Sequence, residues 1–285
     1  MYGALIGDIV GSRFEFNNIK TKDFEFITKD SHFTDDTVLT LAIADYFNKY
    51  GKTLDKNLLI NIVKSTVKKY INAGYGPSFL RWVNSSSNEP YNSYGNGAAM
   101  RVSPVSYVAS SLEECKVLSD FVTSITHNHI EGLKGAFALS SAIFLLLNGK
   151  TKQEIKTYIE TNFYTLDFNY LDLVKNYKFE ISCQKSVPQA LYIFLISTDF
   201  IDALKNIISI GGDSDTLSDM VLALAEAYYL NPKNEEGYKI TSSLSIKKKE
   251  EINNLFKESL SKLDKNLFEI CRLFNQKYNK NTIRL

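Results

Sequence analysis

The sequence predicts an all-α protein, on three observations. Apolar residues recur at three- and four-residue spacing along most of the chain, as in amphipathic helices. No strict alternation of apolar and polar residues persists long enough to build a sheet. Only five of the 285 residues are proline, and no linker rich in proline, glycine and serine divides the chain. We therefore predict one compact domain spanning residues 1–285, large enough to bury an extensive core.

Several of the predicted helices have clear boundaries. Gly51 and Gly149 are placed to end helices, and Thr151 with Glu154 forms a capping box at the start of another. After a polar, turn-rich stretch at 231–245, an apolar stripe without helix breakers predicts one long helix over residues 246–278. We expect this helix to pack on its own domain, with a dimer-forming helix as the alternative. The other predicted helices cover residues 35–47, 58–71, 112–125, 131–147, 152–158, 188–195, 203–208 and 217–230.

Composition and the cysteines limit the possible functions. The formal net charge of +1 argues against a general electrostatic binder of nucleic acids. Cys115, Cys183 and Cys271 are widely separated and lack metal-binding spacing, so we expect reduced thiols in the core. The chain starts without the pattern of a signal peptide, and its longest apolar run, near residues 142–147, is too short to cross a bilayer. We therefore expect a cytoplasmic protein with no membrane partner.

Two acidic clusters, at residues 33–37 and 211–216, stand directly before helix-patterned runs. Each offers two carboxylates and at least two hydroxyls, whereas helix capping needs one short polar side chain and one acid. Around an N-cap the backbone is only half helical, so these oxygens can converge. Face to face, the clusters would form an all-oxygen pocket of the kind that hard divalent cations prefer. Helix caps without a metal are the alternative.

Five motifs occur in a characteristic order: GALIGDIVG at 3–11 with Glu15, FTDDT at 33–37, GNGAAMR at 95–101, THNH at 126–129 and GGDSDT at 211–216. In these motifs the chain resembles the ADP-ribosylglycohydrolase family, which includes the dinitrogenase reductase-activating glycohydrolase. The resemblance implies an all-helical fold with two Mg²⁺ or Mn²⁺ ions in a cleft. It also implies hydrolysis of an ADP-ribosyl bond, with ADP-ribose as the product. The metal ligands that it implies are Thr34, Asp35, Asp36, Asp213, Asp215 and Thr216.

The resemblance further implies that Glu15 sits on a mobile flap over the metals, where it positions substrate or water. One carboxylate among Glu15, Asp35 and Asp213 would take the proton of the attacking water, and the sequence does not decide which. The bond-breaking step would pass through an oxocarbenium-like state, as in other glycoside hydrolyses. The acceptor released could be arginine, serine, a nucleic-acid base or a small molecule.

Four residues near the motifs are given structural roles. Asp8 is expected to orient the first loop rather than to bind metal, and Gly7 and Gly11 to allow tight turns beside the cleft. Asp219 follows the second cluster in a helical pattern. We expect it to face solvent, with a supporting contact to a metal ligand as the alternative.

Gly95, Asn96 and Gly97 form a turn that runs into a small-residue helix start. Glycine lets backbone N–H groups approach a ligand closely, so we expect this turn to cradle a pyrophosphate. His127 either donates a hydrogen bond to a phosphate or ribose oxygen or caps the following helix. The pair of His127 and His129 lacks a further nitrogen or sulfur partner, which argues against zinc.

Two other functions are compatible with parts of the pattern. The acidic clusters alone would suit a different two-metal hydrolase, such as a phosphoesterase. A catalytically silent ADP-ribose-binding module would need the turn at 95–97 but not a complete ligand set. We favour the metal-dependent ADP-ribosyl glycohydrolase and expect it to be a monomer.

Overall fold

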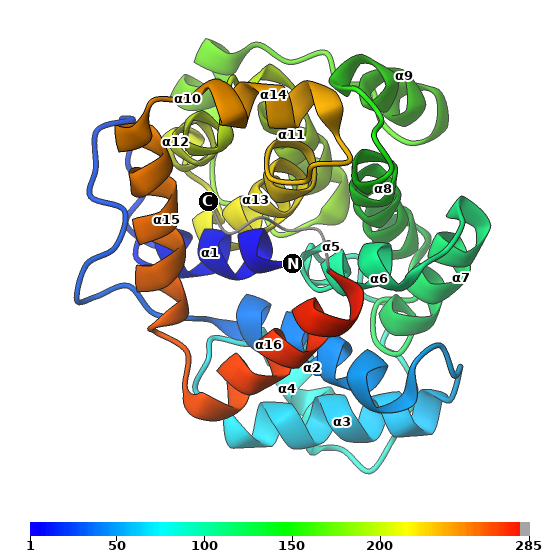
Figure 1. Ribbon diagram of the computed structural model, residues 1–285. Helices are drawn as coiled ribbons and strands as arrows, with labels where there is room; N and C mark the ends of the chain where they lie inside the picture. Colours follow the sequence, from blue (N-terminus) through cyan, green and yellow to red (C-terminus); the bar gives the residue numbers. More distant parts are fainter. Residues whose placement is uncertain (280–285) are drawn as a thin grey trace.

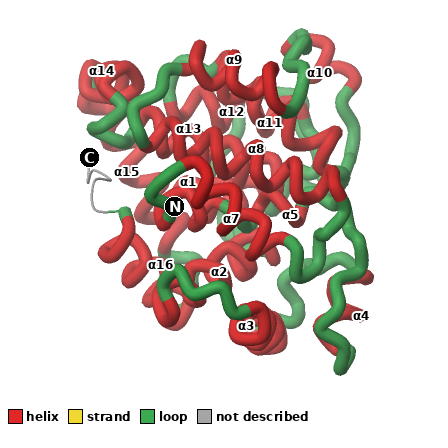
Figure 2. The backbone as a smooth tube through the Cα atoms, turned by 90° about the vertical axis from the view of Figure 1, so that its right-hand side faces the viewer, coloured by secondary structure: helices red, strands yellow, loops and turns green. Residues whose placement is uncertain are grey.

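The computed structural model describes residues 1–279, where helices are joined by loops without a strand (Figures 1 and 2). The all-α prediction is confirmed, and the last six residues of the predicted domain lie outside the described part. The helices are α1 (Tyr2–Gly11), α2 (Asp35–Tyr50), α3 (Lys56–Lys69), α4 (Pro77–Asn84), α5 (Gly97–Met100), α6 (Ser103–Val108), α7 (Leu112–Thr123), α8 (Ile130–Leu147), α9 (Lys152–Asn162), α10 (Tyr170–Asn176), α11 (Cys183–Ile196), α12 (Phe200–Ile210), α13 (Ser214–Tyr229), α14 (Glu235–Ser243), α15 (Ile246–Leu260) and α16 (Lys265–Tyr278).

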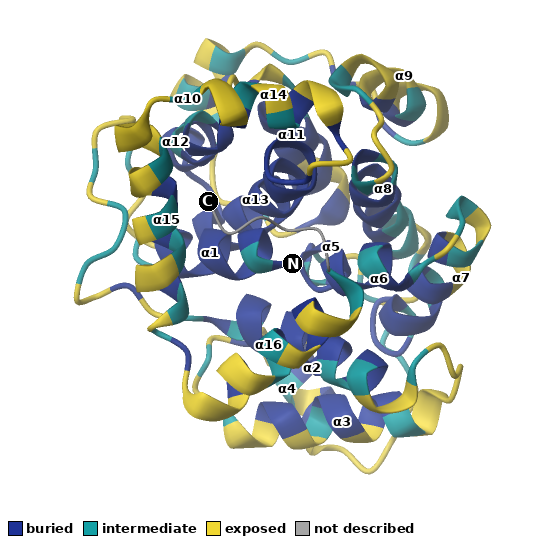
Figure 3. Cartoon of the chain, viewed as in Figure 1, coloured by how far each residue is buried: buried dark blue, intermediate teal, exposed yellow. Residues whose placement is uncertain are grey.

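Helices α1 and α13 form the buried centre of the molecule (Figures 1 and 3). A Cβ atom added to Gly3 or Gly7 of α1 would lie 2.1 Å from the carbonyl oxygen of Leu222 or Ser218. Glycine is required there because the two helix backbones touch. The helices run antiparallel, so the end of α1 at Gly11 meets the start of α13. The prediction that Gly7 and Gly11 make turns in a loop was wrong, since both lie within a helix and serve its close packing.

Helix α8 is a second core helix and packs against α7, α11 and α13. By length and composition it could cross a membrane, so the prediction that every apolar run is too short was wrong. The charged residues Glu131 and Lys134 lie only in its first turns, and 61% of it is buried inside the molecule. Such burial is typical of a helix at the centre of a helical core.

All eight helices predicted before residue 231 are present, with ends moved by a few residues. Gly51 and Gly149 have φ of 58° and 86°, which favours glycine at the helix ends that they follow. The capping box of Thr151 and Glu154 is formed. The sequence pattern did not reveal α1, whose one buried charge sits in an otherwise apolar run, or the short helices α4, α6, α10 and α14.

The C-terminal segment is two helices, so the prediction of one continuous helix over 246–278 was wrong. The side chain of Asp264 accepts hydrogen bonds from the backbone N–H groups of Asn266 and Leu267, which caps α16 and ends the continuity with α15. Helix α15 packs on α1 and α16 packs on α2. The segment therefore docks on its own chain, as predicted.

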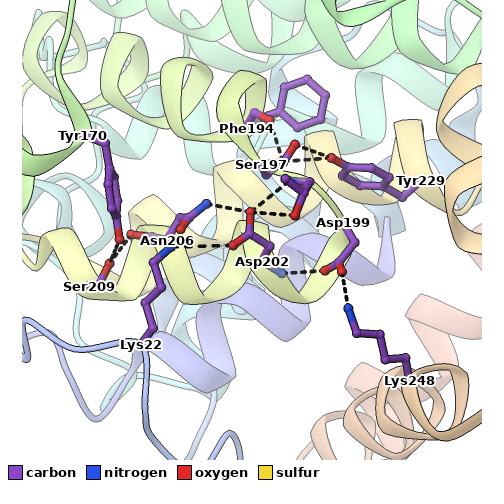
Figure 4. Close-up of polar contacts among 11 residues, drawn as sticks. Lys22, Tyr170, Phe194, Ser197, Asp199, Asp202, Asn206, Ser209, Tyr229 and Lys248 are labelled. Carbon is purple, nitrogen blue, oxygen red and sulfur yellow. Dashed lines mark hydrogen bonds and ion pairs between the residues drawn. The ribbon is translucent and has the colours of Figure 1, made fainter. Parts of the chain in front are cut away.

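A polar network over α12 holds the segments that lead into the site (Figure 4). Asp199 caps α12 and also pairs with Lys248 of α15 at 3.0 Å. Lys22, in the long loop after α1, lies 3.7 Å from Asp202 of α12 and 4.8 Å from the ring centre of Tyr170. Helix α12 is thereby joined to both α15 and the loop, and it runs directly into the turn before α13.

Candidate active site

A cleft of about 460 Å³ opens beside the start of α2 and the start of α13. This volume falls in the range of small-molecule sites, roughly 300–1,000 Å³. Thr34, alone among the predicted site residues, is not part of its lining. The predicted residues that line the cleft are Glu15, Asp35, Asp36, Gly95, Asn96, Gly97, His127, Asp213, Asp215 and Thr216.

In the first acidic cluster, one residue caps a helix and another has a carboxylate oxygen without a hydrogen-bond partner among the described residues. The Thr34 hydroxyl accepts from the backbone N–H of Asp36 at 3.3 Å and donates to Asp8 at 2.7 Å. Capping therefore accounts for Thr34, as the alternative interpretation held. Asp36 is buried, and its Oδ2 atom has no hydrogen-bond partner among the described residues. An orphaned buried carboxylate oxygen is costly unless a ligand or ion satisfies it.

The second cluster faces the first. Asp213 stands at the N-cap position of α13 but caps no backbone N–H; its carboxylate instead accepts from the Asn96 side chain at 2.6 Å. The hydroxyl of Thr216 donates to Asp36 across the two clusters at 3.3 Å. The start of α2 and the start of α13 thus present their oxygens to each other, as the sequence analysis expected.

Two groups of carboxylates could each hold a cation. The first group is Asp8, Asp36 and Asp215, and the second is Glu15, Asp213 and Asp215. Within each group, one oxygen per residue lies within 4.8 Å of the others. Asp215 belongs to both groups, which therefore adjoin. Carboxylate oxygens at such spacing suit Mg²⁺ and Mn²⁺, so the donor chemistry fits a binuclear centre.

Asp8 is the residue of this site that the sequence analysis missed as a candidate ligand. It projects from α1 and accepts hydrogen bonds from the backbone N–H groups of Thr34 and Thr37 at 2.9 and 3.0 Å. A single acid within an otherwise apolar, glycine-spaced helix was the signal that could have found it. Asp8 was expected to orient the first loop, and it does hold the end of that loop at Thr34. It does so from within a helix, and it belongs to one of the two groups of carboxylates.

Asp219 corrects another expectation, because it does not face solvent. It lies one helical turn after Asp215 and is fully buried, and neither carboxylate oxygen has a hydrogen-bond partner among the described residues. Burial raises its pKa well above the ordinary value, and the charges of Asp8 and Asp215 add to that effect. The site thus has a carboxyl group behind the candidate ligands of α13.

The electrostatics of the acidic end are strongly unbalanced. Among the described residues, no Lys, Arg or His forms an ion pair with any acid of the two carboxylate groups. Burial raises the pKa of Asp213 to about 6. Burial first, and then the charge of Asp215, raises the pKa of Glu15 to about 8. Burial and like charge also raise the pKa of Asp36 and Asp215. A bound cation would relieve this repulsion.

Glu15 lies in a loop, as predicted, and the loop is anchored on both sides of it. Phe14 is buried, and the Asn18 side chain exchanges hydrogen bonds with the backbone N–H and carbonyl of Gly212 at 2.7 and 2.8 Å. Between these anchors the exposed ring of Phe16 stacks on Phe179, with ring centres 6.0 Å apart. Both rings line the cleft beside Glu15.

The other end of the cleft is formed by residues 95–97 and His127. The N–H groups of Gly95 and Asn96 are already used, by Ser93 Oγ and the carbonyl of Ile181. The turn therefore offers a ligand fewer backbone donors than predicted. The two interpretations of His127 are separated by the structure: His129 caps α8, whereas His127 lines the cleft.

Residues 1–229 match the sequence model of the ADP-ribosylglycohydrolase family. The chain belongs to the ADP-ribosylglycohydrolase family. It is therefore a hydrolase of the ADP-ribosyl class. The match covers both acidic clusters and the turn at 95–97, and it ends where α13 ends.

Named relatives of this ADP-ribosylglycohydrolase are distant. ADP-ribosylhydrolase ARH3 of Mus musculus is 25% identical, with 80% of this chain and 82% of the relative covered. ARH3 of Xenopus tropicalis is also 25% identical, with 84% and 90% covered. A solved structure described as an ADP-ribosylglycohydrolase-related protein complex shares the fold, with a TM-score of 0.68 at 17% identity over 96% of this chain and 94% of that one.

Proposed function

We propose that this glycohydrolase uses two divalent metal ions to cleave a glycosidic bond of ADP-ribose, releasing ADP-ribose from a modified acceptor. One observation carries the proposal: two adjoining groups of carboxylates share Asp215 beside a cleft, and within residues 1–279 no basic side chain pairs with any of them. The turn at 95–97 and His127 line the same cleft, and His127 carries a ring nitrogen beside Gly97. An elongated ligand with hydroxyls at one end and phosphates towards the other matches this layout.

The residues that would hold the ions are Asp8, Asp36 and Asp215 at one position and Asp213 and Asp215 at the other, where Glu15 lies close enough to contact the ion or its water. Thr216 lies beside them, and its hydroxyl already contacts Asp36. Asp35 lines the same cleft but belongs to neither group. Bound Mg²⁺ or Mn²⁺ would supply Lewis-acid chemistry, which polarises coordinated oxygens and acidifies water.

Glu15 is our candidate for the residue that takes the proton of the attacking water. It is only partly buried and it lines the cleft, so a water molecule in the cleft can reach its carboxylate. Asp35 and Asp213 are the other candidates. Asp213 already accepts a hydrogen bond from Asn96, which favours its carboxylate form over proton transfer.

Asn96 connects the two ends, because its side chain bonds Asp213 while its neighbour Gly97 faces His127. We place the ribose that carries the scissile bond at the carboxylates and the phosphates nearer Gly97 and His127. The acceptor then leaves past Glu15 and the ring pair of Phe16 and Phe179. Their geometry does not select among arginine, serine and nucleic-acid acceptors.

The test is release of ADP-ribose from a panel of arginine-, serine- and nucleic-acid-linked ADP-ribose, with Mg²⁺, with Mn²⁺ and with excess chelator. We expect at least one linkage to be cleaved only when a divalent ion is present. Phosphodiester and phosphomonoester substrates serve as controls for a two-metal phosphoesterase. Full activity in chelator, or cleavage of phosphoesters alone, would contradict the proposal.

A further inference from the structure

Arg101, the first residue after α5, is completely buried without an acid beside it. Among the described residues no carboxylate lies within 4.0 Å of its guanidinium, and its Nε and Nη1 atoms have no hydrogen-bond partner. The charges of Tyr91 and Cys183 do not compensate it, because burial raises the pKa of each to about 12 and keeps both neutral. Buried cations are normally paired, so this one calls for an explanation.

Among the described residues, only Nη2 of the Arg101 guanidinium makes hydrogen bonds, and it contacts His127, which lines the cleft. Nη2 donates to the Thr126 hydroxyl at 2.6 Å and to the carbonyl of Thr123 at 3.3 Å, and it lies 3.3 Å from Nδ1 of His127. The Thr126 hydroxyl also lies 2.8 Å from that Nδ1. Arginine has donors and no acceptor, so a hydrogen bond between Nη2 and Nδ1 has Nδ1 as its acceptor.

A hydrogen bond from Nη2 to Nδ1 sets the tautomer of His127. With Nδ1 as an acceptor, the ring proton sits on Nε2. A Cβ atom added to Gly97 would lie 3.3 Å from Nε2, and one added to Gly95 would lie 3.6 Å from it. The Nε2–H group therefore faces the turn at 95–97 in the lining of the cleft. Burial and the Arg101 charge lower the pKa of His127 well below its ordinary value, so the ring is a neutral donor.

We propose that Arg101 is a positioning residue of the cleft. It holds His127 with its Nε2–H directed at the Gly95–Gly97 turn, and its unpaired charge makes this end of the cleft selective for a phosphate group. A phosphate in the cleft would accept from Nε2–H and would balance a positive charge that the protein leaves unbalanced. The identity of the full ligand, ADP-ribose, rests on the proposed function, whereas the role of Arg101 does not.

The first test uses the unmodified protein. With ¹⁵N-labelled histidine, two-dimensional NMR distinguishes protonated from unprotonated ring nitrogens, and a His127→Gln variant assigns the signals. We expect Nε2 of His127 to carry the proton and Nδ1 to be bare at neutral pH. A proton on Nδ1, or a doubly protonated ring, would overturn the proposal. Because this measurement needs no Arg101 variant, it stands even if such a variant fails to fold.

The second test measures binding of inorganic diphosphate, without divalent ions, and of ADP-ribose. Arg101→Met removes the charge at similar volume, and Arg101→Lys restores the charge without the planar fork. We expect Arg101→Met to weaken diphosphate binding roughly tenfold or more, with partial recovery in Arg101→Lys, since hydrogen bonds to charged groups contribute at this level. Adenosine, which has no phosphate, should bind equally to all three. Equal diphosphate binding by wild type and Arg101→Met would overturn the proposal.

A double substitution tests the route of the effect. If Arg101 acts partly through His127, the losses from Arg101→Met and His127→Ala will sum to more than the loss in the double variant. Additive losses would contradict this route. A wild-type protein that binds diphosphate but cleaves no ADP-ribosyl bond would refute the proposed function and leave the role of Arg101 standing. Normal hydrolysis with an unchanged KM in Arg101→Met would do the reverse.

Discussion

The two ends of the cleft differ in the sign of their unbalanced charge. At the end formed by α2 and α13, buried carboxylates crowd together, and within the described part of the chain none of them pairs with a cation. At the end formed by the 95–97 turn, the buried guanidinium of Arg101 has no carboxylate partner among residues 1–279. A protein that needed only stability would pair such groups with each other. Under the proposed function, this separation would suit a ligand that brings a cation to the carboxylates and an anion to the turn.

The largest expected effect comes from removing the carboxylate that belongs to both acidic groups. Asp215→Asn should lower hydrolysis by roughly 10³-fold or more, because metal ions contribute several kcal/mol to such reactions and 1.36 kcal/mol is tenfold in rate. It should also abolish the rise in melting temperature that Mg²⁺ or Mn²⁺ gives by mass action. Turnover assays and thermal melts with and without metal check both. Unaltered metal stabilisation in this variant would remove Asp215 from the ion site.

The next effect concerns Glu15, which lies at the boundary of the acidic end and solvent. Glu15→Gln should reduce kcat by about 10²- to 10⁴-fold, the usual contribution of a general acid or base. The amide keeps the size of the side chain, so the structure of the loop should survive. Because Asp213 and Asp215 remain, metal affinity should fall far less than kcat. If metal affinity falls as much as kcat, Glu15 acts chiefly as a ligand.

The packing that builds the acidic end can be tested at α1. Gly7→Ala should destabilise the protein by about 1–3 kcal/mol, as overpacking of a core does, since the new Cβ would collide with the backbone of α13. The shift should also move Asp8 and weaken metal binding. Gly76→Ala is the matched control for stability, because nothing lies within 4 Å of its added Cβ. Chemical unfolding compares the two. Equal stability would show that α1 and α13 can separate without cost.

A larger side chain placed beside His127 tests the other end of the cleft. Gly97→Val should weaken ADP-ribose binding by about tenfold, because its Cβ would lie 3.3 Å from Nε2 of His127 and its branched side chain would displace a phosphate there. Metal-induced stabilisation should be unchanged, since the acidic end is untouched. Calorimetry measures the first and thermal melts the second. A loss of both would mean that the two ends are not separable.

The smallest expected effect is a pH dependence of stability without metal. Burial raises the pKa of Asp213 from 3.8 to about 6 and that of Glu15 from 4.5 to about 8. Between the ordinary and the raised values, the folded protein binds more protons than the unfolded chain, so stability should fall as pH rises through this window. The melting temperature in chelator should drop by a few degrees, since about 1 kcal/mol corresponds to roughly 2–4 °C for a domain of this size. Mg²⁺ should flatten the dependence, and a rise in stability with pH would contradict the charge assignment.

The helical spacing of apolar residues predicted half of the helices that the structure describes. It located α2, α3, α7, α8, α9, α11, α12 and α13, in which apolar residues recur at helical spacing. It failed for α1, a segment of ten residues with three glycines and one acid, where few positions are left to show a period. It failed also at residues 261–264, where no glycine or proline marks the end of α15 and Asp264 alone starts the next helix. Local pattern therefore misses a short glycine-rich helix and a break that no glycine or proline marks.

The candidate site was predictable where its residues are clustered in sequence. Asp35, Asp36, Asp213, Asp215 and Thr216 stand at two helix starts and line one cleft, as expected. Other members depend on contacts between distant segments, which no local pattern contains. Asp8 joins the site because three glycines bring α1 against α13, and Arg101 is exceptional only because no acid lies near it.

The double anchoring of the Glu15 loop limits how far the cleft can open at this point. Phe14 is buried, and two hydrogen bonds join the Asn18 side chain to Gly212, so only residues 15–17 lie between fixed points. Three residues span at most about 10 Å when fully extended. The loop cannot swing wide to admit a large acceptor. A protein or nucleic-acid acceptor would have to reach in, with its modified group standing out from its own surface by several ångströms. Acceptor choice then depends less on sequence around the modification than on how freely the modified group protrudes.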